Sequence, residues 1–217
     1  MRTKHFKSIK ELENALLEAI LRKIDLSIDE HGDARILLSG GNTPRALYSK
    51  MAESEIDWSK VIIGLVDDRN VDLSSRHSNE RMIRDIFKSG SEIIGLVHEN
   101  PKRNLVKKHY APFFERIDYT ILGMGEDGHT ASLFPDDLPS EASLRSSEKD
   151  IVFTTAPNFP NERISCSRGL ILSSKIIGLM IVGERKLSVL NNSGREKLPI
   201  SYFTNSCQQL TTYYCKS

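Results

Sequence analysis

Short apolar runs alternate along the chain with segments whose apolar residues recur at helical spacing. The apolar runs lack the polar alternation of a half-exposed strand, which favours strands buried on both faces. They are RILLS (35–39), VIIGLV (61–66), EIIGLV (92–97), IDYTIL (117–122) and IIGLMIV (176–182), and IVFTT (151–155), RISCS (163–167) and PISYF (199–203) complete the predicted strands.

Three helices are predicted between these strands. Ser8 and Glu11 form a capping box pattern ahead of apolar residues spaced three and four apart, from Ile9 to Ile20. Pro44 stands where the first turn of a second helix tolerates proline, and a third helix begins near Ser78. A basic helical segment is expected between residues 97 and 117, whereas 135–150 reads as a loop or short helix.

This alternation predicts an α/β fold, an open, largely parallel, Rossmann-like sheet with helices on both faces. No internal repeat, low-complexity segment or linker divides the chain, so we expect a single domain over residues 1–217. The C-terminal segment TNSCQQLTTYYCKS matches no pattern that we can interpret.

Composition narrows the possible partners. The 217 residues include 30 Lys+Arg and 29 Asp+Glu, a net charge of +1, which gives no global field for nucleic acid or an acidic membrane. Three cysteines without a C-x-x-C pair fit a reducing compartment, and charges interrupt the N-terminal apolar residues, unlike a signal peptide. We therefore expect a cytoplasmic protein, a monomer, with no nucleic-acid or membrane partner.

The segment GMGEDGHTASLFP (123–135) contains G-x-G-x-x-G after a predicted strand. A dinucleotide site needs a helix of several turns after the glycines, but Pro135 follows Gly128 by seven residues and would end it. We therefore expect no cofactor. The segment is either a tight turn capped by Asp127 or a catalytic loop, in which the imidazole of His129 accepts a proton from water beside the Asp127 carboxylate.

Other polar residues also follow strand ends, where open α/β sheets bind ligands. Backbone N–H groups of SGGNTP (39–44) would favour an anion, unless this is an ordinary turn with Thr43 as the helix cap. Asp67 and Arg69 should point the same way, with Asp68 opposite, and an arginine there suits phosphate unless it forms a surface ion pair. Arg163 and Lys186 are further candidate anion contacts, although a solvated strand-end arginine is an equal alternative for Arg163.

Other chemistries lack support. The six histidines show no paired ligand spacing, so no metal site is expected, and there is no G-x-S-x-G turn for a serine nucleophile. The basic run around Lys102 and Lys107 lacks interleaved aromatic residues and is more typical of a solvated helix face.

In their order and spacing, SGGNTP, VDDRNVD…HSN, GMGEDGHTASLFP, PNERIS and VGERK resemble the 6-phosphogluconolactonases. The similarity runs from about residue 36 to 190. It implies the fold shared with glucosamine-6-phosphate deaminases, ribose-5-phosphate isomerases and CoA-transferase-like proteins. It also implies a metal-free hydrolase that opens a phosphosugar lactone, 6-phosphoglucono-δ-lactone, in the pentose phosphate pathway.

The resemblance assigns roles to individual residues. His129 would be the base that activates water, with Asp127 beside the reacting centre. Arg69, Arg163 and Lys186 would hold the phosphate. The other residues that it places in the substrate pocket are Ser39, Gly40, Gly41, Asn42, Thr43, Asp67 and Gly125.

The chain departs from the family pattern in a few places. The usual D-E-R reads Asp67-Asp68-Arg69, the usual V-P reads Val71-Asp72, and Asn42 replaces the commoner serine. Two alternatives stay open. A glucosamine-6-phosphate deaminase would have a glutamate at the position of Phe134. A non-catalytic sugar-phosphate binder would usually have lost the catalytic base, whereas His129 is present in this chain.

Overall fold

The computed structural model describes residues 2–88, 90–97, 103–205 and 207–216. Its main sheet is parallel throughout, in the order β1-β10-β9-β6-β2-β3-β5. This confirms the predicted fold class. The strands of this sheet are β1 (Arg2–Phe6), β2 (Ala34–Leu38), β3 (Val61–Leu65), β5 (Glu92–Ile94), β6 (Tyr119–Leu122), β9 (Ile176–Val182) and β10 (Leu210–Cys215).

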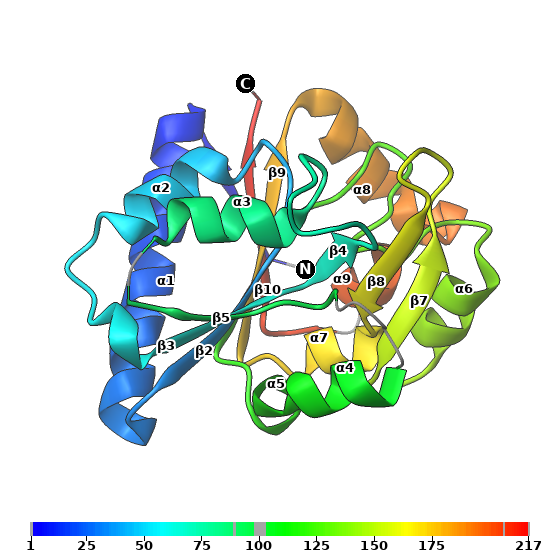
Figure 1. The fold of residues 1–217 in the computed structure, drawn as a ribbon. Helices are drawn as coiled ribbons and strands as arrows, with labels where there is room; N and C mark the ends of the chain where they lie inside the picture. Colours follow the sequence, from blue (N-terminus) through cyan, green and yellow to red (C-terminus); the bar gives the residue numbers. More distant parts are fainter. Residues whose placement is uncertain (1, 89, 98–102, 206, 217) are drawn as a thin grey trace.

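Helices cover both faces of this sheet (Figure 1). Helix α1 packs on one face, where Leu16 lies against Gly178 of β9, and α5 packs on the other, where Phe113 lies against Gly64 of β3. The helices are α1 (Ile9–His31), α2 (Arg45–Ala52), α3 (Asn79–Ile86), α4 (Arg103–His109), α5 (Ala111–Glu115), α6 (Leu138–Arg145), α7 (Arg168–Leu172), α8 (Glu184–Glu196) and α9 (Ser201–Thr204), with a 3-10 turn at Trp58–Lys60.

Helix α1 begins at the capping box that its sequence predicts. The Ser8 side chain accepts a hydrogen bond from the Glu11 N–H at 3.2 Å, and the Glu11 carboxylate accepts one from the Lys7 N–H at 3.1 Å. Gly32, with a φ of 82°, ends the helix, because a left-handed residue at this position costs glycine little. The apolar stripe from Leu12 to Ile24 is fully buried against the sheet.

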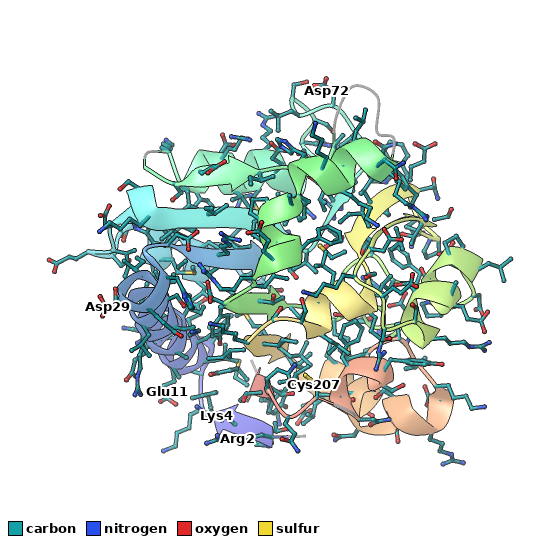
Figure 2. All side chains as sticks on the ribbon, turned by 90° about the horizontal axis from the view of Figure 1, so that it is seen from below. Arg2, Lys4, Glu11, Asp29, Asp72 and Cys207 are labelled. Carbon is teal, nitrogen blue, oxygen red and sulfur yellow. The ribbon has the colours of Figure 1, made fainter. Side chains whose placement is uncertain are left out.

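A second sheet is antiparallel and consists, in this order, of β4 (Asp67–Arg69), β8 (Glu162–Cys166) and β7 (Ile151–Thr155). Strand β4 follows β3 after one residue, so the chain passes from the main sheet directly into the small one. The loop after β4 contains Asp72, which Figure 2 shows at the opposite end of the molecule from Arg2 and Lys4 of the edge strand β1.

Two predictions about elements need correction, and one segment without a prediction forms a strand. PISYF is not a strand: Ser201–Thr204 form α9, in which Ile200 and Phe203 are buried three residues apart, as on one face of a helix. The uninterpreted C-terminal segment contains β10, which pairs with β9 and β1. EIIGLV contributes only Glu92–Ile94 to a strand. The single-domain assignment stays a prediction.

The contact between Gly64 and α5 gives a test of the packing. A Cβ atom at Gly64 would lie 2.5 Å from the Phe113 ring and 2.7 Å from Leu37. Because the ring cannot move without opening the core, Gly64→Ala should lower the free energy of unfolding by about 1–3 kcal/mol in urea titrations.

Gly194 provides the matched control for this substitution. It lies in α8, where a Cβ would meet no atom closer than Asn205 Nδ2 at 3.6 Å. Gly194→Ala should therefore raise the free energy of unfolding by about 0.5–1 kcal/mol through helix propensity. Equal effects of the two substitutions would contradict the packing argument.

Candidate active site

A cavity of about 290 Å³ opens beside the carboxyl ends of β2 and β6. Loops from both sheets contribute to it, because β4 and β8 lie next to the ends of the parallel strands. Its lining residues are Ser39, Gly40, Gly41, Asp67, Arg69, Asn79, Gly123, His129, Ala131, Ser132, Phe134, Ala156, Pro157, Asn158 and Arg163.

His129 and Asp127 form a hydrogen-bonded pair at this cavity. His129 Nδ1 lies 2.5 Å from Asp127 Oδ1, and the His129 backbone N–H donates to the same oxygen at 3.1 Å. With the carboxylate accepting from Nδ1–H, the lone pair of the imidazole is on Nε2. Among the described residues Nε2 has no hydrogen-bond partner, and the ring lines the cavity. The pair has the arrangement of a general base and its orienting group.

The ionisation of Asp127 suits this arrangement. Partial burial opposes the charged form, but the hydrogen bonds and positive charge of His129 outweigh it and hold the pKa of Asp127 below its usual 3.8. The carboxylate therefore stays ionised at neutral pH and fixes which ring nitrogen holds the proton.

The backbone of residues 123–129, the glycine loop, accounts for the position of the His129 imidazole. A Cβ at Gly125 would lie 2.2 Å from the His129 ring, so only glycine lets the ring fold back over this residue. Gly128 has a φ of 77°, and its carbonyl accepts from the Ile200 N–H at 3.0 Å. On the other side the Phe134 ring packs at 4.8 Å between centroids. The loop is a turn and also places His129 at the cavity.

Arg69 and Arg163 lie side by side at the cavity. They are directly opposite each other in the antiparallel pair of β4 and β8. Arg163 Nε donates to the Pro160 carbonyl at 2.8 Å, and Arg69 Nη1 donates to the His77 carbonyl at 2.7 Å. Burial and the neighbouring charge of Arg69 lower the pKa of Arg163. Two adjacent guanidinium groups fit a doubly charged anion such as phosphate.

Asp67 connects this arginine pair with the loop that contains His129. Its Oδ2 accepts from Ser132 Oγ at 2.5 Å, and Ser132 follows His129 by three residues. Asp67 and Arg69 both line the cavity, whereas the buried Asp68 does not, as the alternation along a strand predicts.

The loop of residues 39–44, the Ser39 loop, lies between β2 and α2. Its residues Ser39, Gly40 and Gly41 line both this cavity and a smaller one of about 160 Å³. Ser39 Oγ donates to the Ile121 carbonyl at 2.8 Å, so its hydroxyl fixes the loop to β6. Lys186, at the start of α8, and Thr43 line the smaller cavity and not the larger one. Lys186 and the two arginines therefore line two adjacent cavities that share Ser39, Gly40, Gly41 and Gly123.

The remaining predicted residues lie beside the cavities. Gly125 and Asp127 support the His129 ring from behind, and neither they nor Asn42 line either cavity. Thr43 does not cap α2, whose N-cap position is occupied by Pro44 without a side-chain hydrogen bond.

Sequence reasoning missed several lining residues. Asn79 stands in the HSN segment and Ser132 and Phe134 in GHTASLFP, so the motifs contained the signal. The segment 156–158 follows β7 and had no such signal, because only the pairing of β7 with β8 brings it to the cavity.

Within the part of the chain that the structure describes, no cluster of three His, Cys, Asp or Glu side chains could hold a metal ion. No helix among the same residues is long and apolar enough to cross a bilayer.

The parallel sheet and the histidine and arginine side chains at one cavity are what the resemblance to the 6-phosphogluconolactonases implies. Comparison with known proteins gives the same family. Residues 7–212 match the family described as glucosamine-6-phosphate isomerases/6-phosphogluconolactonase, and the chain belongs to this family.

Within it, the similar curated proteins are 6-phosphogluconolactonases. The one from Helicobacter pylori is 32% identical, over 98% of this chain and 97% of its own length. The one from Pseudomonas putida is also 32% identical, over 95% and 89%. The crystal structure of a 6-phosphogluconolactonase from Shewanella baltica superposes with a TM-score of 0.89 at 29% identity, covering 100% of this chain and 98% of that one.

The Asp127–His129 pair gives a test of the orientation of the ring. The pKa of Asp127 lies below 3.8, so this carboxylate is ionised at neutral pH and accepts from Nδ1–H. Asp127→Asn should lower kcat/KM, because the amide can donate to Nδ1 and thereby leave the ring proton on Nε2, where the lone pair is needed. Wild-type kcat/KM in this variant, measured at neutral pH, would contradict the pairing.

Proposed function

We propose that the protein hydrolyses 6-phosphoglucono-δ-lactone to 6-phosphogluconate, a step of the pentose phosphate pathway. The observation that carries the proposal is the unpartnered Nε2 of His129 at a cavity that also contains two paired arginines. A water-activating base and an anion-binding pair in one cavity are what a phosphorylated lactone requires. The names of the curated relatives support the same activity.

In the proposed mechanism, the phosphate binds Arg69 and Arg163 and thereby orients the lactone ring. His129 Nε2 takes a proton from a water molecule as the water oxygen attacks the lactone carbonyl carbon. Asp127 stabilises the resulting imidazolium through Nδ1–H. The ring C–O bond then breaks, and the imidazolium returns its proton to the ring oxygen, which becomes a hydroxyl group of the product. The new carboxylic acid loses its own proton to solvent. No covalent intermediate with the protein is needed.

The Ser39 loop and the glycine loop are the candidates for stabilising the tetrahedral oxyanion. Gly40, Gly41 and Gly123 line the cavity with backbone close to its surface. Backbone N–H groups in such loops can donate to developing negative charge. Lys186 lines the adjacent cavity, which shares Ser39, Gly40 and Gly41 with the larger one, and we propose that it also contacts the substrate anion.

The nearest alternative activity is deamination of glucosamine 6-phosphate. That reaction needs a carboxyl group to assist the histidine in ring opening, at the position that Phe134 occupies here. Phe134 packs against the His129 ring and cannot transfer a proton. A non-catalytic sugar-phosphate binder is the other alternative, against which the intact Asp127–His129 pair argues.

One pair of assays separates the three functions. Acid release from freshly prepared 6-phosphogluconolactone is measured beside ammonia release from glucosamine 6-phosphate. We expect acid release only. Ammonia release would establish the deaminase. If neither acid nor ammonia is released, only the non-catalytic binder is left.

We further propose that the enzyme works in the cytoplasm as a monomer, without a cofactor, nucleic acid or membrane.

His129 gives the first test of the mechanism. His129→Ala should lower kcat by roughly 10²–10⁴, because the attacking water loses its base, while inorganic phosphate should bind with unchanged affinity. His77→Ala is the matched control, since the His77 ring contacts Phe159, does not line the cavity and has no part in the mechanism. A His129→Ala variant with wild-type turnover would remove this residue from the chemistry.

The arginine pair gives the second test. Arg163→Ala should raise KM by roughly 10- to 100-fold with a smaller change in kcat, because a charge-assisted contact to the phosphate is lost. Lys186→Ala should also raise KM. Arg195→Ala, in the exposed last turn of α8, is the control and should change neither constant. A loss confined to kcat in Arg163→Ala would contradict the role in binding.

A further inference from the structure

Asp68 is a buried carboxylate that the proposed mechanism does not use. Its side chain is 0% exposed and does not line either cavity. It accepts three backbone hydrogen bonds, from Arg69 at 2.7 Å, from Asn79 at 2.7 Å and from Glu80 at 2.9 Å. Ser78 Oγ donates more weakly at 3.4 Å. A buried carboxylate with this many fixed donors holds several backbone segments in one geometry.

The donors lie at the two ends of one loop. Arg69 ends β4, and Asn79 begins α3 after the intervening residues 70–78. Both residues line the larger cavity. One carboxylate therefore fixes the backbone of two cavity residues that the chain separates by a loop, and it also satisfies orphan N–H groups in the first turn of α3.

The side chains at the base of the same loop form a second set of contacts. Asn79 Nδ2 donates to the Asp67 carbonyl at 3.0 Å, and Arg69 Nη1 donates to the His77 carbonyl. The Asn79 amide occupies the space where a Cβ at Gly40 would lie, with Oδ1 2.0 Å from that position. A shift of the Asn79 backbone would therefore disturb the Arg69 strand and the Ser39 loop together.

The charge of Asp68 fits this role. Burial, with a smaller contribution from the nearby Asp67, raises the pKa of Asp68 to about 6 against the opposing effect of the three backbone N–H groups. The group is therefore mostly ionised at neutral pH, where its hydrogen bonds are charge-assisted. Its negative charge also acts on Arg163, which it helps to keep protonated beside Arg69.

We infer that Asp68 is a positioning residue for substrate binding, which sets Arg69 and Asn79 at the phosphate end of the cavity without touching the substrate. This inference rests on the proposed function, because phosphate is the anion that the arginine pair would hold. It predicts an effect on binding that is separate from an effect on the chemical step.

Asp68→Asn tests the inference, because it keeps the side-chain shape but replaces one acceptor oxygen by a donor. We expect KM for the lactone and the dissociation constant of inorganic phosphate, measured by calorimetry, to rise together by about fivefold or more, while kcat changes less than about twofold. An unchanged phosphate affinity, or a loss confined to kcat, would overturn the inference.

Ser78→Ala is the matched control for the same helix end. Ser78 Oγ accepts from the Arg81 N–H at 3.1 Å, so the variant weakens the cap of α3. It also removes the weak hydrogen bond of 3.4 Å to Asp68, but the carboxylate and its three backbone donors stay in place. We expect a lower melting temperature but KM within about twofold of wild type. If Ser78→Ala raises KM as much as Asp68→Asn does, helix stability alone explains the effect and the inference is wrong.

Amide hydrogen exchange of the wild-type protein tests the clamp even if Asp68→Asn does not fold. Without ligand, the amides of Arg69, Asn79 and Glu80 should exchange as slowly as those inside α3; exchange as fast as in residues 70–77 would overturn the inference. Phosphate calorimetry and exchange do not require lactonase activity. A protein that binds phosphate in an Asp68-dependent way but opens no lactone would reject the proposed function and keep the positioning role.

Discussion

The antiparallel pairing of β4 with β8 is the contact on which the rest of the site depends. It joins β4, which directly follows β3 of the main sheet, to a strand almost a hundred residues later in the chain. It thereby places Arg69 opposite Arg163. Two cations held side by side repel each other, and partial burial increases the cost. The fold tolerates this arrangement because Asp67 and Asp68 lie in the same strand, and a bound anion would offset the remaining charge.

The loop that contains His129 is positioned by contacts within itself, with the segment before α9 and with the small sheet. Gly125 leaves room for the imidazole, the Ile200 N–H supports the Gly128 carbonyl, and Ser132 reaches across to Asp67. The proposed base and the proposed anion site are therefore connected by one short hydrogen bond. In the proposed mechanism, orientation of the substrate by its phosphate would place the carbonyl near His129.

Hydrophobic periodicity predicted most of the fold. The central strands β2, β3, β6 and β9 and helix α1 follow from local patterns, because a strand buried on both faces must be apolar throughout and a helix needs one apolar stripe. PISYF was wrong because a four-residue helix and a short strand share the same composition, and only the tertiary burial of Ile200 and Phe203 distinguishes them. Strand β10 was missed because its threonines and tyrosines are buried between neighbours that the local sequence does not reveal.

For the site, the sequence by itself determined the chemical groups: a histidine beside an aspartate on a glycine loop, and cations at strand ends. These are local, since Asp127 and His129 are two residues apart and their hydrogen bond needs only the turn between them. Only the tertiary structure decided which cations share a cavity. It put Arg69 with Arg163 and assigned Lys186 to the neighbouring cavity, because strand pairing and the path of the Ser39 loop depend on packing between distant segments.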